Sequence, residues 1–163
     1  MTKRNKEKAY ESYDEIVQWF DDARTKTLME LEYLNLIVKS VPVGGFVLDL
    51  GCGTGEPIAQ FFINKGFQVS GVDGSRNMIE LCKRRFPSER WIVSDMRDIN
   101  LKQKFDVVLA WHSFFHLEHD SQRKMFKIFS EHTKPGGILA FTSGNEEGEV
   151  WSNNDGQELF EIG

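Results

Sequence analysis

Cysteine is scarce in this chain and long apolar runs are absent, and each shortage excludes a class of protein. The two cysteines, Cys52 and Cys82, form neither a CxxC pair nor a disulfide framework, so we expect small buried thiols in a reducing compartment. No apolar stretch approaches the ~20 residues that a membrane helix needs. None follows the basic residues 1–8, so we expect no secretory signal, no membrane partner and a cytoplasmic location.

Positive charge is also in short supply, with 20 lysines and arginines against 25 acidic residues and a formal net charge of −5. Nucleic acids are bound by basic surfaces, so this balance argues against nucleic acid as a partner. The apolar share of 40% and the charged share of 28% are those of an ordinary globular protein. A chain of 163 residues is long enough for one domain with a buried core.

Short apolar runs alternate with helical patterns through the middle of the chain. The runs predict strands at residues 46–50, 68–72, 90–93, 105–110 and 138–142. The intervening patterns predict helices near 57–65, 75–85 and 120–132, and two earlier helices within 9–23 and 28–38. This alternation is typical of an α/β fold with a doubly wound, mainly parallel sheet covered by helices on both faces.

We expect a single domain in three parts. Residues 1–42 form cap helices, residues 43–143 form the ligand-binding core, and residues 144–163 form a polar tail. The tail shows no convincing strand pattern. Pro135-Gly136-Gly137 is expected to be a turn that leads into the last strand.

Three glycines at alternate positions, Gly51, Gly53 and Gly55, follow the first predicted strand directly. Glycine allows the main chain to turn sharply and to approach a ligand without a Cβ in the way. In doubly wound sheets, ligands bind outside the carboxyl ends of the strands at the switch point, where this turn falls. A dinucleotide site needs G-x-G-x-x-G, but Glu56 occupies the third glycine position, which disfavours a nicotinamide-dependent oxidoreductase.

An acidic residue, Asp73, directly follows the second predicted strand. It stands about 20 residues beyond the glycine turn, which is the spacing of the ribose-binding acid in nucleotide-binding α/β folds. A carboxylate accepts hydrogen bonds from both hydroxyls of a ribose. The alternative is that Asp73 only caps the next helix, in competition with Ser75.

The run from Asp49 to Gly55 resembles the first motif of class I S-adenosylmethionine-dependent methyltransferases. Further segments resemble the family in the same order: residues 69–75, 94–97, 105–117 and 133–139. The resemblance covers residues 43–143 and implies a sheet of order 3-2-1-4-5, S-adenosyl-L-methionine as cofactor and S-adenosyl-L-homocysteine as product. The cofactor-binding residues that it implies are Asp49, Gly51, Cys52, Gly53, Gly55, Asp73, Gly74, Asp95, Met96 and Trp111.

The resemblance also implies which residues would contact each part of the cofactor. Asp95 would meet the adenine amino group and Met96 would pack on the ring, although Met96 also fits a plain core position. The cofactor has no pyrophosphate, and amides at the helix N-terminus after the glycine turn would suit its methionyl carboxylate. Tyr10, Tyr13 and Trp19 could reach the pocket from the covering helices, although that stripe also fits the core.

The segment from Phe105 to Leu117 supplies the candidate catalytic residues. His112 and His116 are candidate general bases, because histidine titrates near neutrality, although His116 also fits a structural role. The segment departs from the Asn-Pro-Pro-Tyr motif of many nucleic-acid amino methyltransferases, so a small-molecule acceptor fits better than a base. The nearby histidines and acids show no closing metal ligand, so we expect no metal site.

The methyltransferase fold usually continues beyond the fifth strand into a helix and an antiparallel strand pair, for which this chain shows no pattern. The open sheet edge would be covered by the tail, by a second copy of the chain in a homodimer, or by nothing. We predict a methyltransferase that acts on a small-molecule acceptor. The alternative is a non-catalytic or truncated S-adenosylmethionine-binding module that needs a partner chain or a dimer.

Overall fold

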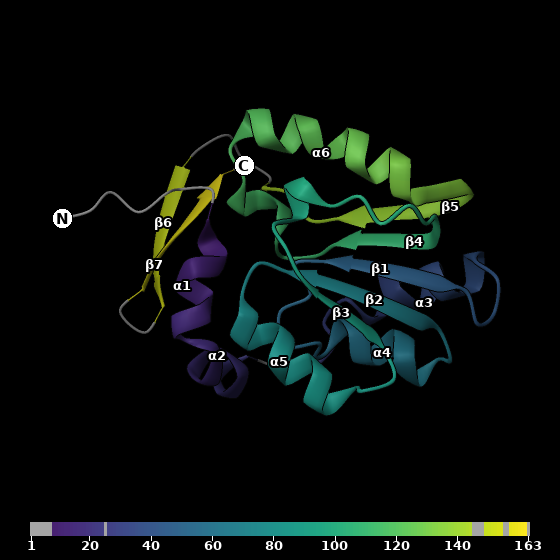
Figure 1. Ribbon diagram of the computed structural model, residues 1–163, viewed down its shortest axis with the longest axis horizontal. Helices are drawn as coiled ribbons and strands as arrows, with labels where there is room; N and C mark the ends of the chain where they lie inside the picture. Colours follow the sequence, from purple (N-terminus) through teal and green to yellow (C-terminus); the bar gives the residue numbers. More distant parts are fainter. Residues whose placement is uncertain (1–7, 25, 145–148, 155–156, 163) are drawn as a thin grey trace.

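The computed structural model describes residues 8–24, 26–144, 149–154 and 157–162, and its centre is a parallel sheet (Figure 1). The strand order is β3-β2-β1-β4-β5. The strands are β1 (Phe46–Leu50), β2 (Gln68–Asp73), β3 (Arg90–Val93), β4 (Phe105–Ala110) and β5 (Thr133–Phe141). All the pairings in this sheet are parallel, so the predicted Rossmann-like order 3-2-1-4-5 is confirmed.

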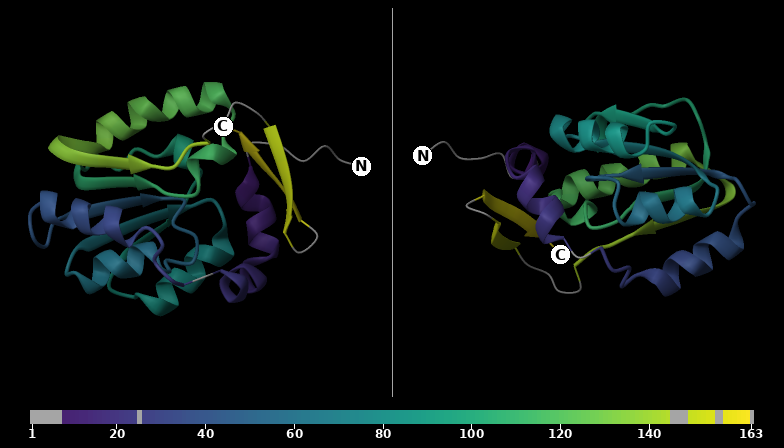
Figure 2. Two further views of the ribbon diagram at one scale, coloured as in Figure 1. Left: turned by 180° about the vertical axis from the view of Figure 1, so that it is seen from behind. Right: turned by 90° about the horizontal axis from the view of Figure 1, so that it is seen from below.

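The central strand β1 sends alternate side chains into two cores, one on each face of the sheet. The helices that cover the two faces are seen in Figure 2. Val47 packs into the core formed with α3 (Leu31–Ser40), α4 (Ile58–Asn64) and α5 (Arg76–Arg85). Leu48 and Leu50 pack into the core formed with α6 (His119–His132). Because both faces are covered, the strands read as nearly continuous apolar runs, which made most of their bounds predictable.

Local signals fix the ends of the helices beside the sheet. The Ser75 side chain accepts a hydrogen bond from the Met78 N–H at 3.1 Å and so caps the start of α5. After the end of α4, the Gly66 N–H donates to the Ile63 carbonyl, with a φ of +84° at Gly66. Both ends were predicted. None of the described helices is long and apolar enough to span a membrane.

The first predicted helix, over residues 9–23, is two helices. They are α1 (Ala9–Glu15) and α2 (Val17–Ala23), separated at Ile16, whose φ of −111° and ψ of 18° are not helical. Ile16 is 5% exposed, so the break turns an apolar side chain into the protein. Both helices lie across the carboxyl ends of the strands, where we call them the cap (Figure 1).

The expectation of a tail without strands was wrong. β6 (Glu149–Asn154) and β7 (Gln157–Ile162) pair as an antiparallel hairpin, which forms a separate sheet. β7 packs against α1 and against the short 3-10 helix η2 (Phe114–His116) (Figure 1). The hairpin therefore covers the cap, and β5 is the edge of the main sheet within the described residues.

The last strand of the main sheet begins earlier than predicted. β5 starts at Thr133, and Pro135-Gly136-Gly137 lies inside it rather than before it. The pairing with β4 shifts at this point, from Phe105 opposite Thr133 to Val107 opposite Ile138. The tripeptide is therefore an irregularity within the strand, which a turn signal in the sequence does not distinguish from a true turn.

We expect Leu48→Ala to lower the free energy of unfolding by about 2 to 5 kcal/mol, because it leaves a cavity in the core between β1 and α6. Leu48 is fully buried, whereas Leu36 on the outer side of α3 is 62% exposed. Leu36→Ala is the matched control and should change the same quantity by less than about 0.5 kcal/mol. Urea denaturation measures both, and equal effects would contradict this arrangement of α3 and β1.

Candidate functional site

The glycine turn after β1 is held between the ends of β2 and β4. Gly51, Gly53 and Gly55 have φ values of +76°, +54° and +80°, all in the left-handed region. The Gly51 and Cys52 N–H groups both donate to the Val72 carbonyl, at 2.7 and 3.1 Å. A Cβ on Gly51 would stand 2.3 Å from the Cβ of Ser113, so the turn also packs tightly beside the segment after β4.

Gly53 differs from its neighbours because the space above it opens into a cavity. A Cβ there would have no atom nearer than 3.8 Å, and the nearest atoms belong to Arg24 and Phe20 of the cap segment. A Cβ on Gly55 would instead stand 3.1 Å from the Phe86 ring. Gly53 is thus the member of the turn whose bare backbone faces open space.

The cavity measures about 420 Å³ and lies between the glycine turn and the cap. Its volume is within the usual range for small-molecule sites. The predicted residues that line it are Gly51, Gly53, Asp73, Gly74, Asp95, Met96, His112 and His116. The cap adds aromatic side chains to the lining, namely Tyr10, Tyr13, Trp19 and Phe20.

Four predicted binding residues do not line the cavity. Asp49 is 3% exposed inside the sheet, Cys52 is 7% exposed, and Gly55 packs on Phe86. Trp111 lies toward α3, with its ring centroid 6.4 Å from that of Tyr33. The structure does not place any of these four residues at the surface of the cavity.

Asp73 faces the cavity and also holds the glycine turn in place. Its carboxylate accepts hydrogen bonds from the Gly53 N–H at 2.9 Å and from the Ser75 N–H at 2.8 Å. Burial raises the pKa of Asp73, and these two hydrogen bonds act against that rise. Ser75 is the residue that caps α5, so the helix cap and the carboxylate at the cavity are different groups.

Asp95 is paired with its neighbour Arg97. The Arg97 Nε donates to Asp95 Oδ1 at 2.9 Å, and its Nη2 lies 2.6 Å from Oδ2. Burial alone would raise the pKa of Asp95, but the hydrogen bonds from Arg97 outweigh it and hold the pKa below its ordinary value. Asp95 is therefore an ionised acceptor at the cavity wall.

The two candidate histidines have different surroundings. The His112 Nε2 lies 3.0 Å from Glu30 Oε1, and His112 has a left-handed φ of +50°. His116 is 7% exposed, and its Nε2 lies 3.3 Å from the Tyr13 hydroxyl of α1. Within the described residues, no three histidine, cysteine or carboxylate side chains gather as a metal site would require.

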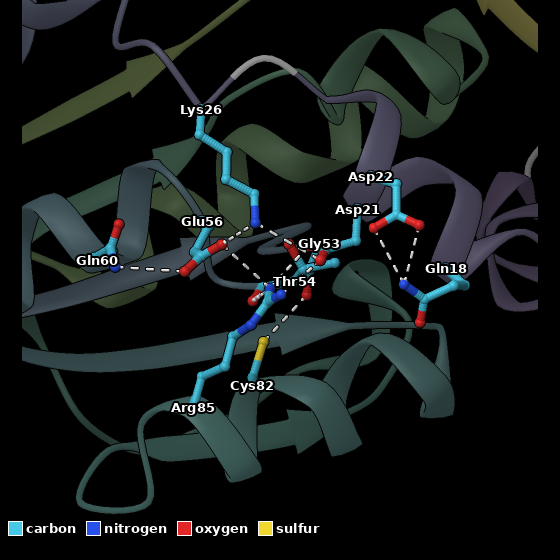
Figure 3. A network of polar contacts seen from close by, with 10 residues as sticks. All are labelled: Gln18, Asp21, Asp22, Lys26, Gly53, Thr54, Glu56, Gln60, Cys82 and Arg85. Carbon is cyan, nitrogen blue, oxygen red and sulfur yellow. Dashed lines mark hydrogen bonds and ion pairs between the residues drawn. The ribbon is translucent and has the colours of Figure 1, made fainter.

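Ion pairs fasten the cap to the core beside the glycine turn (Figure 3). Arg85 at the end of α5 donates through Nη1 and Nη2 to both oxygens of Asp21, which is 6% exposed on α2. Lys26, just after α2, places its Nζ 2.7 Å from Glu56 Oε2. The hydrogen bonds from Arg85 are the main cause that lowers the pKa of Asp21, and they keep its carboxylate charged.

A second attachment joins α1 to the start of α5. Asp14 Oδ1 accepts hydrogen bonds from the Ser75 hydroxyl at 2.6 Å and from the Asn77 N–H at 2.8 Å. The Tyr10 ring covers Gly74, where an added Cβ would stand 2.2 Å from the ring. The cap is therefore seated directly over the ends of β2 and the glycine turn.

Residues 47–137 match the sequence model of a protein family described as a methyltransferase domain. The chain belongs to this family. The match spans the sheet from β1 into β5 and so contains the glycine turn and Asp73.

Two curated relatives resemble this chain at moderate sequence identity. It is 35% identical over 116 residues to the putative methyltransferase YqeM of Bacillus subtilis, covering 68% of this chain and 47% of that protein. It is 29% identical over 109 residues to a dTDP-4-amino-2,3,4,6-tetradeoxy-D-glucose N,N-dimethyltransferase of Saccharopolyspora spinosa, covering 66% and 43%. The chain thus spans about half the length of the curated relatives it matches.

A solved structure supports the fold over nearly the whole methyltransferase domain. The complex of DhpI with SAH superposes with a TM-score of 0.76 at 20% identity, covering 96% of this chain and 78% of that one. At this level of identity, the comparison bears on the fold alone. The shared coverage includes the cap, which the family sequence match leaves out.

Sequence reasoning missed two charged residues of the cavity in this methyltransferase domain. Arg24 and Glu30 both line it, and neither belongs to a motif. They come from the segments that follow α2 and precede α3, whose position over the sheet depends on the cap attachments rather than on local sequence. The break at Ile16 carries no glycine or proline signal that would have predicted it.

We expect Asp49→Asn to stabilise the domain increasingly as the pH rises from about 4 to about 7. Burial raises the pKa of Asp49 to about 7 from an ordinary 3.8, so the folded chain holds a proton that the unfolded chain releases in this window. The wild-type free energy of unfolding therefore falls as the pH rises, by up to roughly 4 kcal/mol, whereas asparagine does not titrate.

Urea denaturation of both proteins at pH 5 and pH 8 measures this difference. The gain from the substitution should be larger at pH 8. The same gain at both pH values would show that the Asp49 carboxyl is ionised throughout.

Proposed function

We propose that this chain binds S-adenosyl-L-methionine and transfers its methyl group to a small-molecule acceptor, with S-adenosyl-L-homocysteine as the product. The observation that carries this proposal is that the bare backbone at Gly53 and the Asp73 carboxylate face one cavity at the switch point of the sheet. A nucleoside with a ribose diol and no pyrophosphate fits that pairing. Membership of the methyltransferase domain family supports the same ligand.

The residues around the cavity fit the parts of such a cofactor. Asp73 would accept hydrogen bonds from the ribose hydroxyls, since each carboxylate oxygen accepts more than one. Asp95 and Met96 line the cavity together, where they would meet the amino group and the face of adenine. Tyr10 over Gly74 would close the site from the cap side.

The cofactor supplies an activated methyl group, so the protein's task is to position the acceptor and manage its proton. The Tyr13 hydroxyl lies 3.3 Å from the His116 Nε2, so the acceptor's proton would pass to this hydroxyl while the hydroxyl gives its own proton to Nε2. The cap would exclude water, because one ion pair holds α2 against the end of α5 and a second holds Lys26 to Glu56 beside the glycine turn. His112 stands at the same wall, oriented by Glu30.

The names of relatives support a small-molecule acceptor. Two are N,N-dimethyltransferases of dTDP-linked amino sugars, from Saccharopolyspora spinosa and Streptomyces venezuelae. The comparisons do not favour the alternative of a non-catalytic binding module. The acidic net charge supports a non-nucleic-acid acceptor, and the two free, buried thiols support a reducing, cytoplasmic location. The homodimer through the edge of β5 stays a prediction, which sedimentation would test.

We expect Asp73→Asn to weaken the binding of S-adenosylhomocysteine by roughly 10- to 100-fold, because it removes charge-assisted hydrogen bonds to the ribose. Isothermal calorimetry with S-adenosylmethionine, S-adenosylhomocysteine and NAD measures the effect and the ligand class. Ser75→Ala is the matched control, since it removes the hydroxyl that caps α5 but keeps both the Asp73 carboxylate and the backbone N–H that donates to it. Wild-type protein that binds neither adenosyl ligand, or that binds NAD more tightly, would overturn the proposal.

We expect His116→Gln to lower the rate of methyl transfer by about 100-fold or more if His116 is the general base. The affinity for S-adenosylhomocysteine should stay within about threefold. The rate is measured as S-adenosylhomocysteine released with the first acceptor found in a panel of amines, alcohols, phenols and thiols. An unchanged rate and pH profile would show that His116 is not the general base. The protein would then accelerate the reaction only by positioning the cofactor and the acceptor.

A further inference from the structure

Glu30 is a carboxylate of the cavity that the proposed function uses only to orient His112. It stands directly before α3, its side chain is 14% exposed, and it lines the cavity. Its Oε1 lies 3.0 Å from the His112 Nε2. Burial acts to raise the pKa of Glu30, but hydrogen bonds, first from its own backbone N–H and then from His112, hold the pKa below its ordinary value. Glu30 is therefore an ionised and largely enclosed group.

Glu30 lies on the other side of the glycine turn from the residues assigned to adenosine. Asp73 ends β2 and Asp95 follows β3, and both strands lie on one side of β1 in the sheet. His112, the partner of Glu30, follows β4, which lies on the opposite side of β1. The part of the cavity at Glu30 is thus available to the methyl acceptor.

The negative charge of Glu30 has no lysine or arginine beside it. Among the described residues that line the cavity, Arg24 alone is of that kind, and it stands beside Gly53 over the Phe20 ring. No ion pair joins it to Glu30 in the described part of the chain. A neutral acceptor would displace water from the carboxylate without compensating its charge, whereas a cationic acceptor would pair with it.

Aromatic rings continue the cavity wall from His112. The Phe115 ring centroid lies 6.4 Å from that of His112 and 4.7 Å from that of His116. The Tyr13 hydroxyl reaches the His116 Nε2, and all four residues line the cavity. The faces of phenylalanine and tyrosine rings attract cations. A carboxylate next to such rings favours an ammonium group over a hydroxyl.

We propose that Glu30 selects a primary or secondary amine as the methyl acceptor by binding it in its ammonium form. This inference rests on the proposed function, which places methyl transfer in this cavity. One N–H of the ammonium donates to the Glu30 carboxylate, and another proton passes to the Tyr13 and His116 pair.

The freed electron pair on the nitrogen then forms the N–C bond to the methyl carbon. The C–S bond breaks as this bond forms, and its electron pair stays on sulfur. The products are a methylated ammonium ion and S-adenosylhomocysteine, whose thioether is neutral. Positive charge grows on the nitrogen during this step, and the Glu30 carboxylate stabilises it.

Two probes of similar shape test the preference for a cation. Benzylamine is an ammonium ion at neutral pH and benzyl alcohol is neutral, and each is titrated by NMR into protein saturated with S-adenosylhomocysteine. We expect the amine to bind roughly 10-fold more tightly than the alcohol, and Glu30→Gln to reduce this ratio to about twofold or less. In the acceptor panel, S-adenosylhomocysteine should be released with amines rather than with the matching alcohols.

Glu32→Gln is the matched control, because it removes an exposed carboxylate from the first turn of the same helix. It should leave the ratio of the two probes unchanged. Both variants should bind S-adenosylmethionine and S-adenosylhomocysteine within about threefold of the wild-type affinity, since Glu30 serves the acceptor. The melting temperature confirms that each variant folds.

Equal binding of the two probes by the wild type, or an unchanged ratio in Glu30→Gln, overturns the inference while the proposed function stands. Methyl transfer to alcohols but not to amines overturns it as well. If Glu30→Gln weakens S-adenosylmethionine alone, the carboxylate serves the sulfonium, and if it weakens both adenosyl ligands, it serves the cofactor's amino group. Either result overturns the inference. If the wild-type protein binds neither adenosyl ligand, the proposed function falls and this inference falls with it.

Discussion

The carbonyl oxygen of Val72 accepts the N–H groups of both Gly51 and Cys52, and the rest of the site is built around this junction. It bends the chain back at the end of β1 and fixes the turn against the end of β2. Asp73, the next residue, then reaches the Gly53 N–H from the other side. Left-handed backbone at the three glycines makes this double attachment sterically accessible. The site is therefore a property of two adjacent strand ends rather than of one loop.

Most of the sheet could be predicted from the sequence because its signals are local. The apolar runs of β1, β3 and β4 gave their bounds, since strands covered on both faces need apolar residues throughout. Ser75 and Gly66 marked helix ends by their own side-chain and backbone chemistry. The break at Ile16, the early start of β5 and the hairpin of β6 and β7 could not be predicted this way. Each depends on what the segment packs against.

The residues of the candidate site also fall into those that local sequence predicts and those that only the packing places there. Asp73 and Asp95 were found from their places after strands, and the structure puts both at the cavity. Asp49 belongs to the same motif as Gly51, yet it lies inside the sheet, where β1 pairs with strands on both sides. A residue's place in a motif predicts that it lies near the site, but it does not predict whether its side chain faces the cavity. Arg24 and Glu30 show the converse, because they reach the cavity only through the placement of the cap.

Glu56 links two properties of this protein that a sequence motif would treat separately. It occupies the position where a dinucleotide-binding turn carries its third glycine, and it is also the anchor to which Lys26 of the cap segment is fastened. A redesign that introduced glycine there to admit a pyrophosphate would at the same time remove the partner of Lys26 and leave Arg85 with Asp21 alone, which weakens the attachment of the cap. The Glu56 side chain therefore affects both which nucleotide the turn can accept and how the cap is attached. A substitution that changes the first also changes the second.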